Sequence, residues 1–179
     1  MSIAEQIHST VTLDELLAAK ERRAARQDAW LARYRQPLIS LTLVTPGPVK
    51  DSALYRRSMR AALSACDSLL RARGWPVRAQ EVFWPDTGPE ALWSVDHPAV
   101  EIKAAAVALE QEHPLGRLWD IDVISPQDGI IGRGSLDYAR RGCLLCDQPA
   151  HACARSRRHP LEQVVGKIEE LLDAYFADN

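Results

Sequence analysis

The chain has 179 residues, of which 46% are hydrophobic and 26% charged, and its formal net charge is −2. This length suffices for one domain with its own core, and the charge excludes the broadly basic surface that nucleic-acid-binding proteins use. No apolar run is long enough to cross a bilayer, and residues 1–10 lack the basic-then-apolar pattern of a secretion signal, so we expect a cytoplasmic protein with no membrane or nucleic-acid partner.

A capping box starts the first predicted helix. Thr12, with Glu15 three residues later, begins a helix that runs to about residue 36, where Pro37 stops it. The middle of this helix is strongly polar, which indicates a helix that is exposed or covered by a partner. Residues 38–44 alternate and are rich in β-forming side chains, so they predict a strand.

The rest of the chain predicts further strands and helices in turn. Asp51 or Ser52 caps an amphipathic helix that Gly74 closes. The later predicted elements are a strand over 76–84, a loop or hairpin connection over 85–96, a helix over 99–112, a strand over 118–124, a turn over 126–129, a short partner strand over 130–136 and a helix over 161–176. We therefore expect a single α+β domain over residues 1–179, with a mixed β-sheet packed against several helices.

Two aspartates interrupt the apolar run at 118–124. Because side chains alternate along a strand, Asp120 and Asp122 share one face and the apolar residues between them share the other. Neighbouring carboxylates repel, so a divalent cation, a pair of arginines or exposure to water must compensate. Two such carboxylates can ligate Mg²⁺ together with substrate phosphates, as nucleotidyl-transfer enzymes do. The alternative is a solvated face on which each aspartate pairs with a nearby arginine.

A phosphate-binding segment is the second candidate feature. The stretch GPVKDSALYRR, residues 47–57, combines a loop, Lys50, a helix N-terminus, Arg56 and Arg57. Helix N-termini present free N–H groups, and arginine can bind phosphate oxygens in bidentate geometry. In the alternative interpretation Asp51 caps its own helix and the arginines are surface charges.

Three of the four cysteines lie in RRGCLLCDQPAHACARSRRH, residues 140–159. Cys143 and Cys146 have zinc-knuckle spacing, Cys153 follows, and His159 could complete a tetrahedral Cys₃His zinc site. Buried free thiols are the alternative, because the second half does not repeat the Cys-x-x-Cys spacing. The segment is also locally basic, which suggests an anionic ligand or an acidic protein surface. Its arginines are Arg140, Arg141, Arg155, Arg157 and Arg158.

The stretches PLISLTLVTPGPVKDS, EQEHPLGRLWDIDVISP and RRGCLLCDQPAHACARSRRH resemble those of the apo-citrate lyase phosphoribosyl-dephospho-CoA transferase family, from about Leu13 to Leu172. The resemblance implies an enzyme that attaches the 2′-(5-triphosphoribosyl)-3′-dephospho-CoA prosthetic group to a serine of the acyl carrier protein subunit of citrate lyase, releasing diphosphate. This substitution at phosphorus requires charge neutralisation and a well-placed hydroxyl. A nucleotidyltransferase-like fold is one option, although no serine precedes the aspartate strand where that fold usually carries a Gly-Ser pair.

The resemblance also implies roles for the candidate residues. Asp120 and Asp122 would be catalytic, holding Mg²⁺ against the triphosphate, and one of them would receive the serine proton. Asp128 is a weaker candidate for a third carboxylate. Lys50 with Arg56 or Arg57 would neutralise the leaving diphosphate, and Arg117 could reach the phosphates. The arginines near the cysteine cluster would bind the dephospho-CoA phosphates or the acidic carrier. These substrate-binding candidates are Lys50, Arg56, Arg57, Arg117, Arg140, Arg141 and Arg155.

Two other functions are compatible with the sequence. A non-catalytic zinc-binding adaptor could hold an acidic carrier domain through the cysteine cluster and its arginines, but it would leave the aspartate pair without a role. The equivalent transferase for the malonate decarboxylase carrier would use the same prosthetic group and the same chemistry, and only its acceptor protein would differ.

Overall fold

A computed structural model describes residues 8–179. The prediction that the N-terminal segment lacks a secretion signal falls largely on residues 1–7, which lie outside the described residues. The described chain forms a five-stranded sheet of order β2-β3-β1-β4-β5. Its strands are β1 (Leu38–Leu43), β2 (Val77–Phe83), β3 (Glu90–Val95), β4 (Trp119–Ser125) and β5 (Gly129–Ile130). All described strand pairs are antiparallel, so the α+β class is confirmed and the sheet is antiparallel where a mixed one was expected.

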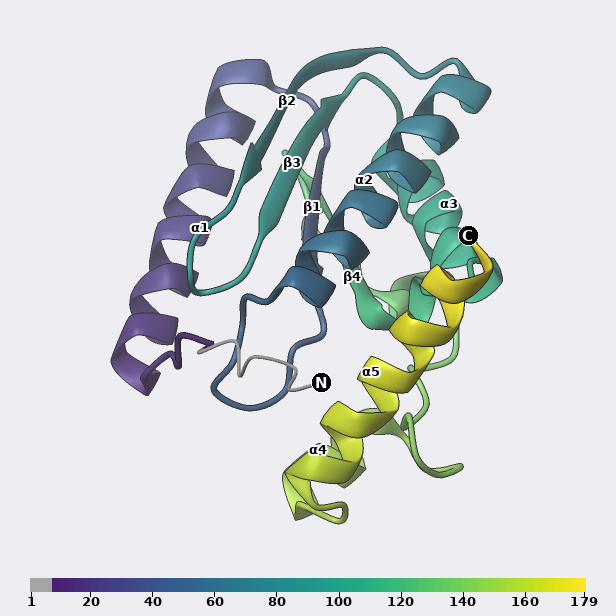
Figure 1. The fold of residues 1–179 in the computed structure, drawn as a ribbon. Helices are drawn as coiled ribbons and strands as arrows, with labels where there is room; N and C mark the ends of the chain where they lie inside the picture. The colour runs from purple at the N-terminus through teal and green to yellow at the C-terminus, as the bar shows by residue number, and fades with distance from the viewer. Residues whose placement is uncertain (1–7) are drawn as a thin grey trace.

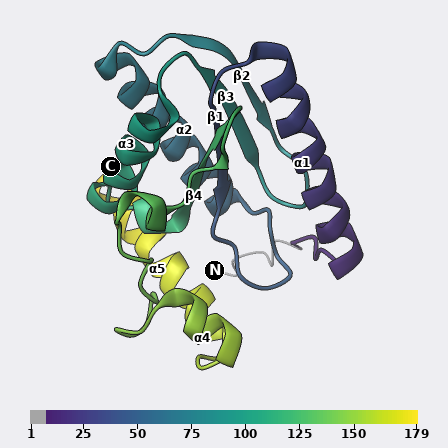
Figure 2. The same cartoon turned by 180° about the vertical axis from the view of Figure 1, so that it is seen from behind.

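Helices cover the two faces of the sheet unequally. The α-helices of the described residues are α1 (Leu13–Tyr34), α2 (Ala53–Arg73), α3 (Ala99–Glu112), α4 (Ala150–Ser156) and α5 (Leu161–Asp178). Figure 1, and the view from behind in Figure 2, show α1 on one side of the sheet and α2, α3 and α5 on the other. Within residues 8–179 no helix has both the length and the apolar sequence needed to cross a bilayer.

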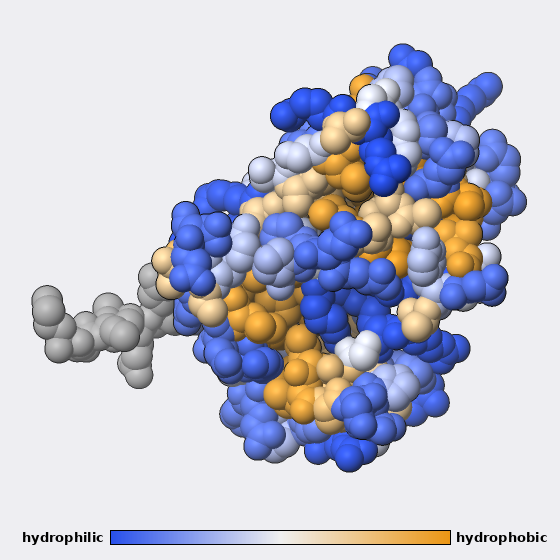
Figure 3. Space-filling model, turned by 90° about the vertical axis from the view of Figure 1, so that its right-hand side faces the viewer, coloured by the Kyte–Doolittle hydropathy of each residue, from blue (hydrophilic) through white to orange (hydrophobic). Residues whose placement is uncertain are grey.

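The main core lies between the sheet and the three helices α2, α3 and α5. Trp93 on β3 and Trp119 on β4 are fully buried there. Each indole N–H has a partner, because Trp93 donates to Asp67 and Trp119 donates to Ser58. A smaller apolar cluster fixes α1 to the opposite face through Trp30 and neighbouring side chains. On the face drawn in Figure 3, hydrophobic surface lies in patches within a mostly hydrophilic exterior.

The helix signals of the sequence are confirmed in detail. Thr12 and Glu15 form the reciprocal hydrogen bonds of a capping box. Of the two cap candidates for α2, Ser52 is the one that accepts a hydrogen bond, from the N–H of Tyr55. Gly74 ends α2 with a φ of 67°, a conformation that glycine adopts without steric cost.

Two predictions about the sheet were wrong. The segment 85–96 was expected to be a loop or hairpin connection throughout; residues 85–89 do connect an antiparallel hairpin, but residues 90–95 form its second strand, β3. The residues of β3 are buried on both faces and so show no alternation. The segment 130–136, expected to be a partner strand, meets β4 only through the pairing of Ile130 and a hydrogen bond from the N–H of Ile131 to the backbone oxygen of Val123. It then forms the short 3₁₀ helix η2 (Arg133–Leu136), which brings Arg133 back toward α3.

A glycine packed against the end of α3 sets the start of β4. The 3₁₀ helix η1 (Gly116–Leu118) precedes β4, and a Cβ on Gly116 would lie 2.2 Å from the backbone oxygen of Glu110. We expect Gly116→Ala to lower the free energy of unfolding by about 1–3 kcal/mol, because the backbone must shift. Urea denaturation measures this, with Gly134→Ala as the control because its Cβ meets nothing within 4 Å. Equal unfolding free energies for the two variants would contradict the prediction.

Candidate active site

The two aspartates lie on the sheet face opposite the main core, as their alternation predicts. Trp119, Ile121 and Val123 of β4 are buried in that core, whereas the Asp120 side chain is 53% exposed and Asp122 is half-buried. Asp120 is paired with Thr42 and Asp122 with Ser40 in the antiparallel register of β4 with β1. The side chains of paired residues point to the same face, so two hydroxyl residues lie beside the carboxylates.

Asp122 occupies an electrostatically unfavourable position. Burial raises the pKa of its carboxyl group, and the negative charge of Asp120 raises this pKa further. Lys103 acts in the opposite direction, Glu110 adds to the increase, and Arg23 on α1 partly offsets it. Among residues 8–179 no hydrogen bond or ion pair reaches the Asp122 carboxylate. The aspartate pair therefore carries negative charge that its described surroundings do not neutralise.

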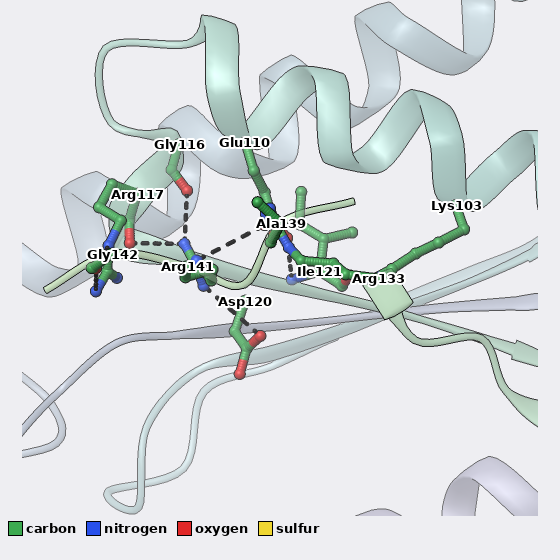
Figure 4. Close-up of polar contacts among 10 residues, drawn as sticks. All are labelled: Lys103, Glu110, Gly116, Arg117, Asp120, Ile121, Arg133, Ala139, Arg141 and Gly142. Atoms are coloured by element: carbon green, nitrogen blue, oxygen red, sulfur yellow. Dashed lines mark hydrogen bonds and ion pairs between the residues drawn. The ribbon is translucent and has the colours of Figure 1, made fainter. Parts of the chain in front are cut away.

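The free edge of β4 is closed by two charged side chains of α3. Glu110 accepts a hydrogen bond from the backbone N–H of Ile121 at 3.0 Å, and Lys103 donates to the backbone oxygen of Ile121 at 3.0 Å (Figure 4). Both side chains are buried, with relative exposures of 7% for Glu110 and 5% for Lys103. They replace the hydrogen bonds of a missing neighbouring strand. Sequence reasoning missed both, because the helix 99–112 carries four charged residues and their spacing does not single out Lys103 and Glu110.

Glu110 also holds two arginines beside the aspartates. Its second carboxylate oxygen accepts from Arg133 at 2.5 Å and lies 3.8 Å from Arg141. Arg141 in turn lies 3.8 Å from the Asp120 carboxylate. Arg133 and Arg141 are largely shielded from solvent, so their charges act over short distances. Arg133, like Glu110, was not among the sequence candidates.

A reciprocal contact ties the arginine segment to the chain before β4. Arg117 donates through Nε and Nη2 to the backbone oxygen of Gly142, at 3.0 and 2.7 Å. Arg141 donates to the backbone oxygens of Gly116 and Arg117, at 3.1 and 2.7 Å (Figure 4). These bonds fix the segment that carries Arg140 and Arg141 next to the aspartate strand.

The aspartates and the arginines share one cavity of about 480 Å³. Its charged lining residues are Lys103, Glu110, Asp120, Asp122, Arg133, Arg140 and Arg141. His151 on α4 also lines it and lies 3.3 Å from Arg140. Carboxylates, a ligand type that suits magnesium, therefore face guanidinium groups, which can bind phosphate, within one cavity.

The other predicted phosphate ligands lie elsewhere. Lys50 donates to the backbone oxygen of Thr45 at 2.5 Å and lines a smaller, separate pocket. Arg56 is paired with Asp51 at 2.6 Å, and Arg57 lies over the Phe176 ring of α5, 4.0 Å from its centroid. Neither arginine lines the aspartate cavity.

Three further sequence candidates also lie outside this cavity or at its border. Arg117 lines the neighbouring apolar cavity of about 790 Å³. Arg155 is exposed on α4. Asp128 accepts a hydrogen bond from Ser125 in the turn after β4 and does not line the aspartate cavity.

The cysteine cluster forms a second compact centre. One ligand atom from each of Cys143, Cys146, Cys153 and His159 lies within 4.8 Å of the others, so the four residues could hold a metal ion. The Cys146 Sγ is 3.5 Å from the Cys153 Sγ and 3.3 Å from the His159 Nε2. Tetrahedral zinc–thiolate geometry separates sulfur atoms by about 3.8 Å. The cysteines and the histidine come from a turn, from α4 and from the link to α5.

Local hydrogen bonds favour the thiolate form of Cys143, whereas burial and the neighbouring thiols raise the pKa of Cys153 to about 11. Burial alone would raise the pKa of the Cys143 thiol, but hydrogen bonds from the backbone N–H groups of Leu145 and Cys146 and from the neighbouring thiols lower it to about 6. The thiolate is the form that ligates metal.

Comparisons with known proteins agree with one another. The sequence model of one family, described as apo-citrate lyase phosphoribosyl-dephospho-CoA transferase, matches residues 11–175, which include both the aspartate strand and the cysteine cluster. A protein of that description from Escherichia coli O1:K1 / APEC is 42% identical over 172 residues, which is 96% of this chain and 94% of the relative. Another, from Escherichia coli O139:H28 (strain E24377A / ETEC), is 41% identical over the same shares.

Proposed function

Because the chain belongs to the apo-citrate lyase phosphoribosyl-dephospho-CoA transferase family, we propose that it attaches the phosphoribosyl-dephospho-CoA group to a serine of the acyl carrier protein subunit of citrate lyase. Family membership makes the chain an enzyme that transfers a phosphorus-containing group. One observation supports placing the reaction at β4: both aspartates share a single cavity with Arg133, Arg140 and Arg141.

The proposed reaction is a substitution at the α-phosphorus of 2′-(5-triphosphoribosyl)-3′-dephospho-CoA. The serine Oγ forms a bond to this phosphorus, the bond from the phosphorus to the bridging oxygen of the β-phosphate breaks, and diphosphate leaves with the electron pair. The serine proton passes to a carboxylate oxygen of the aspartate pair. Arg133 and Arg141 stabilise the charge on the non-bridging oxygens, and Glu110 keeps both arginines in place.

Asp120 and Asp122 have the donor chemistry that magnesium requires. The two carboxylates lie on one face of β4 and repel each other. The cations among the described residues do not fully neutralise the charge of Asp122. A hard divalent cation bound between the two carboxylates and substrate phosphates would relieve the repulsion and neutralise this charge. When bound, Mg²⁺ would offset the charge of the triphosphate.

The cysteine cluster has the ligand set of a structural zinc site. Cys143, Cys146, Cys153 and His159 supply four soft or imidazole ligands, and no open position remains for a substrate. The segment around them contains one short helix, so a bound metal ion would stabilise a segment that has little regular structure.

Metal analysis of the purified protein tests the zinc assignment. We expect about one zinc ion per chain in the wild type, and loss of most of it in Cys146→Ser, with a lower melting temperature. Cys66→Ala is the control, because Cys66 lies in the core on α2, away from the cluster. Zinc retained by Cys146→Ser, or a wild-type protein without zinc, would contradict the assignment.

Phosphorus NMR tests the transfer reaction itself. The protein is incubated with the triphosphoribosyl precursor, Mg²⁺ and the apo acyl carrier subunit, and the released species is identified. We expect free diphosphate only when carrier is present and EDTA is absent. A parallel arm with the malonate decarboxylase carrier tests acceptor choice. Release of orthophosphate or triphosphate would exclude attack at the α-phosphorus.

A further inference from the structure

A second pocket, separate from the aspartate cavity, lies on the β1 side of β4. It has a volume of about 210 Å³ and lies between α1, the end of β1 and the loop before β3. Its polar lining residues are Lys20, Arg23, Thr42, Thr45, Lys50 and Thr87. The polar middle of α1, which the sequence marks as exposed or partner-covered, faces this space through Lys20 and Arg23.

The register of the sheet places this pocket one strand away from the catalytic aspartates. Thr42 lines it, and Thr42 is the residue paired with Asp120 between β1 and β4. Paired residues of antiparallel strands have Cβ atoms about 4.5–5.5 Å apart on the same face. A phosphate chain with one phosphorus at the aspartates can therefore extend directly into the pocket.

Positive charge in this pocket exceeds negative charge. Glu90 accepts from Arg23 at 2.9 Å and from Arg26 at 3.0 Å, so one carboxylate balances two guanidinium groups. In residues 8–179 neither Lys20 nor Lys50 is paired with a carboxylate. Burial lowers the pKa of Lys50, and the charge of Lys20 lowers this pKa further, as expected for two cations that lack an anion between them.

An unused hydrogen-bonding group points to a polar ligand. The hydroxyl of Thr87 is shielded from solvent and has no hydrogen-bond partner among the described residues. Thr87 lines the pocket together with both lysines. A shielded hydroxyl without a partner costs free energy that a bound ligand with acceptor oxygens would recover.

We propose that this pocket binds the diphosphate leaving group, through Lys20, Lys50 and Thr87. The proposal rests on the proposed function, and it specifies the sides of the phosphorus from which the serine attacks and the diphosphate leaves. In-line substitution places the attacking and leaving oxygens on opposite sides of the phosphorus. With diphosphate on the β1 side of β4, the acceptor serine approaches from the β5 side, where Arg133 and Arg141 lie.

Calorimetric binding of inorganic pyrophosphate tests the pocket without any transfer reaction. We expect wild-type protein to bind pyrophosphate, and Lys20→Met and Lys50→Met each to weaken binding by about tenfold or more. Arg33→Met is the matched control: it removes a cation from the same helix, about 20 Å further along its axis, and should bind as the wild type does. Circular dichroism confirms that each variant is folded.

The outcomes separate the pocket from the transfer reaction. Equal pyrophosphate binding by Lys20→Met, Lys50→Met and Arg33→Met would overturn the proposal, as would orthophosphate binding as tight as that of pyrophosphate. If pyrophosphate binds in the expected pattern but the protein does not modify the carrier, the diphosphate pocket is upheld and the proposed transfer to the carrier is rejected.

Discussion

Asp122→Asn is expected to lower the single-turnover rate of carrier modification by about a thousandfold while leaving the fold intact. The substitution removes a negative oxygen from the proposed magnesium site but preserves side-chain shape. Stability should not fall, because burial and the charge of Asp120 already disfavour the carboxylate at this position. Loss of activity without loss of stability is the signature of a residue kept for function.

A carboxylate from the same hairpin provides the control. Asp128→Asn changes an aspartate in the turn after β4. Among residues 8–179 the hydrogen bonds of Asp128 stay within this turn, and Asp128 does not line the aspartate cavity. We expect this variant to retain the wild-type rate. A rate for Asp122→Asn within tenfold of the Asp128→Asn rate would remove Asp122 from the mechanism.

Glu110→Ala is expected to lower the free energy of unfolding by about 3–5 kcal/mol. The substitution leaves Arg133 without its partner and the backbone N–H of Ile121 without an acceptor. Glu110→Gln keeps an acceptor for that N–H but removes the negative charge. Its free energy of unfolding should therefore lie between those of the wild type and Glu110→Ala. Urea denaturation at neutral pH measures both variants.

Glu112→Ala provides the comparison for this position, because Glu112 is exposed on the same helix. An unfolding free energy for Glu110→Ala within about 0.5 kcal/mol of that of Glu112→Ala would contradict the role assigned to Glu110. Glu110→Ala and Glu110→Gln should also lose transfer activity, because Arg133 and Arg141 would no longer be held beside the aspartates.

Local patterns predicted the parts of the fold that depend on neighbours in sequence. The capping box at Thr12, the end of α2 at Gly74 and the alternation around Asp120 all follow from short-range geometry. The strand β3 escaped prediction because burial on both faces removes the alternation that marks a strand. Its interior place in the sheet depends on pairing with β1, a segment distant in sequence that no local pattern encodes.

The candidate site was predictable only in part, for the same reason. The aspartates could be identified because both stand on one strand, and the cysteine cluster because its spacing is short. Glu110 and Lys103 meet β4 through the packing of α3, and Arg133 meets Glu110 through the placement of η2. Conversely, Arg57 looked close to a phosphate site in sequence, but its helix packs on the opposite face of the sheet.

The intact mass of the apo acyl carrier subunit, measured after incubation with precursor and Mg²⁺, tests the central claim most directly. With wild-type protein we expect the carrier to gain the mass of one phosphoribosyl-dephospho-CoA group, located on a serine by fragmentation. With the folded double variant Asp120→Asn, Asp122→Asn we expect no gain. An unmodified carrier in the wild-type reaction would contradict the transfer reaction. Full modification by the double variant would contradict the assignment of the site to the aspartates.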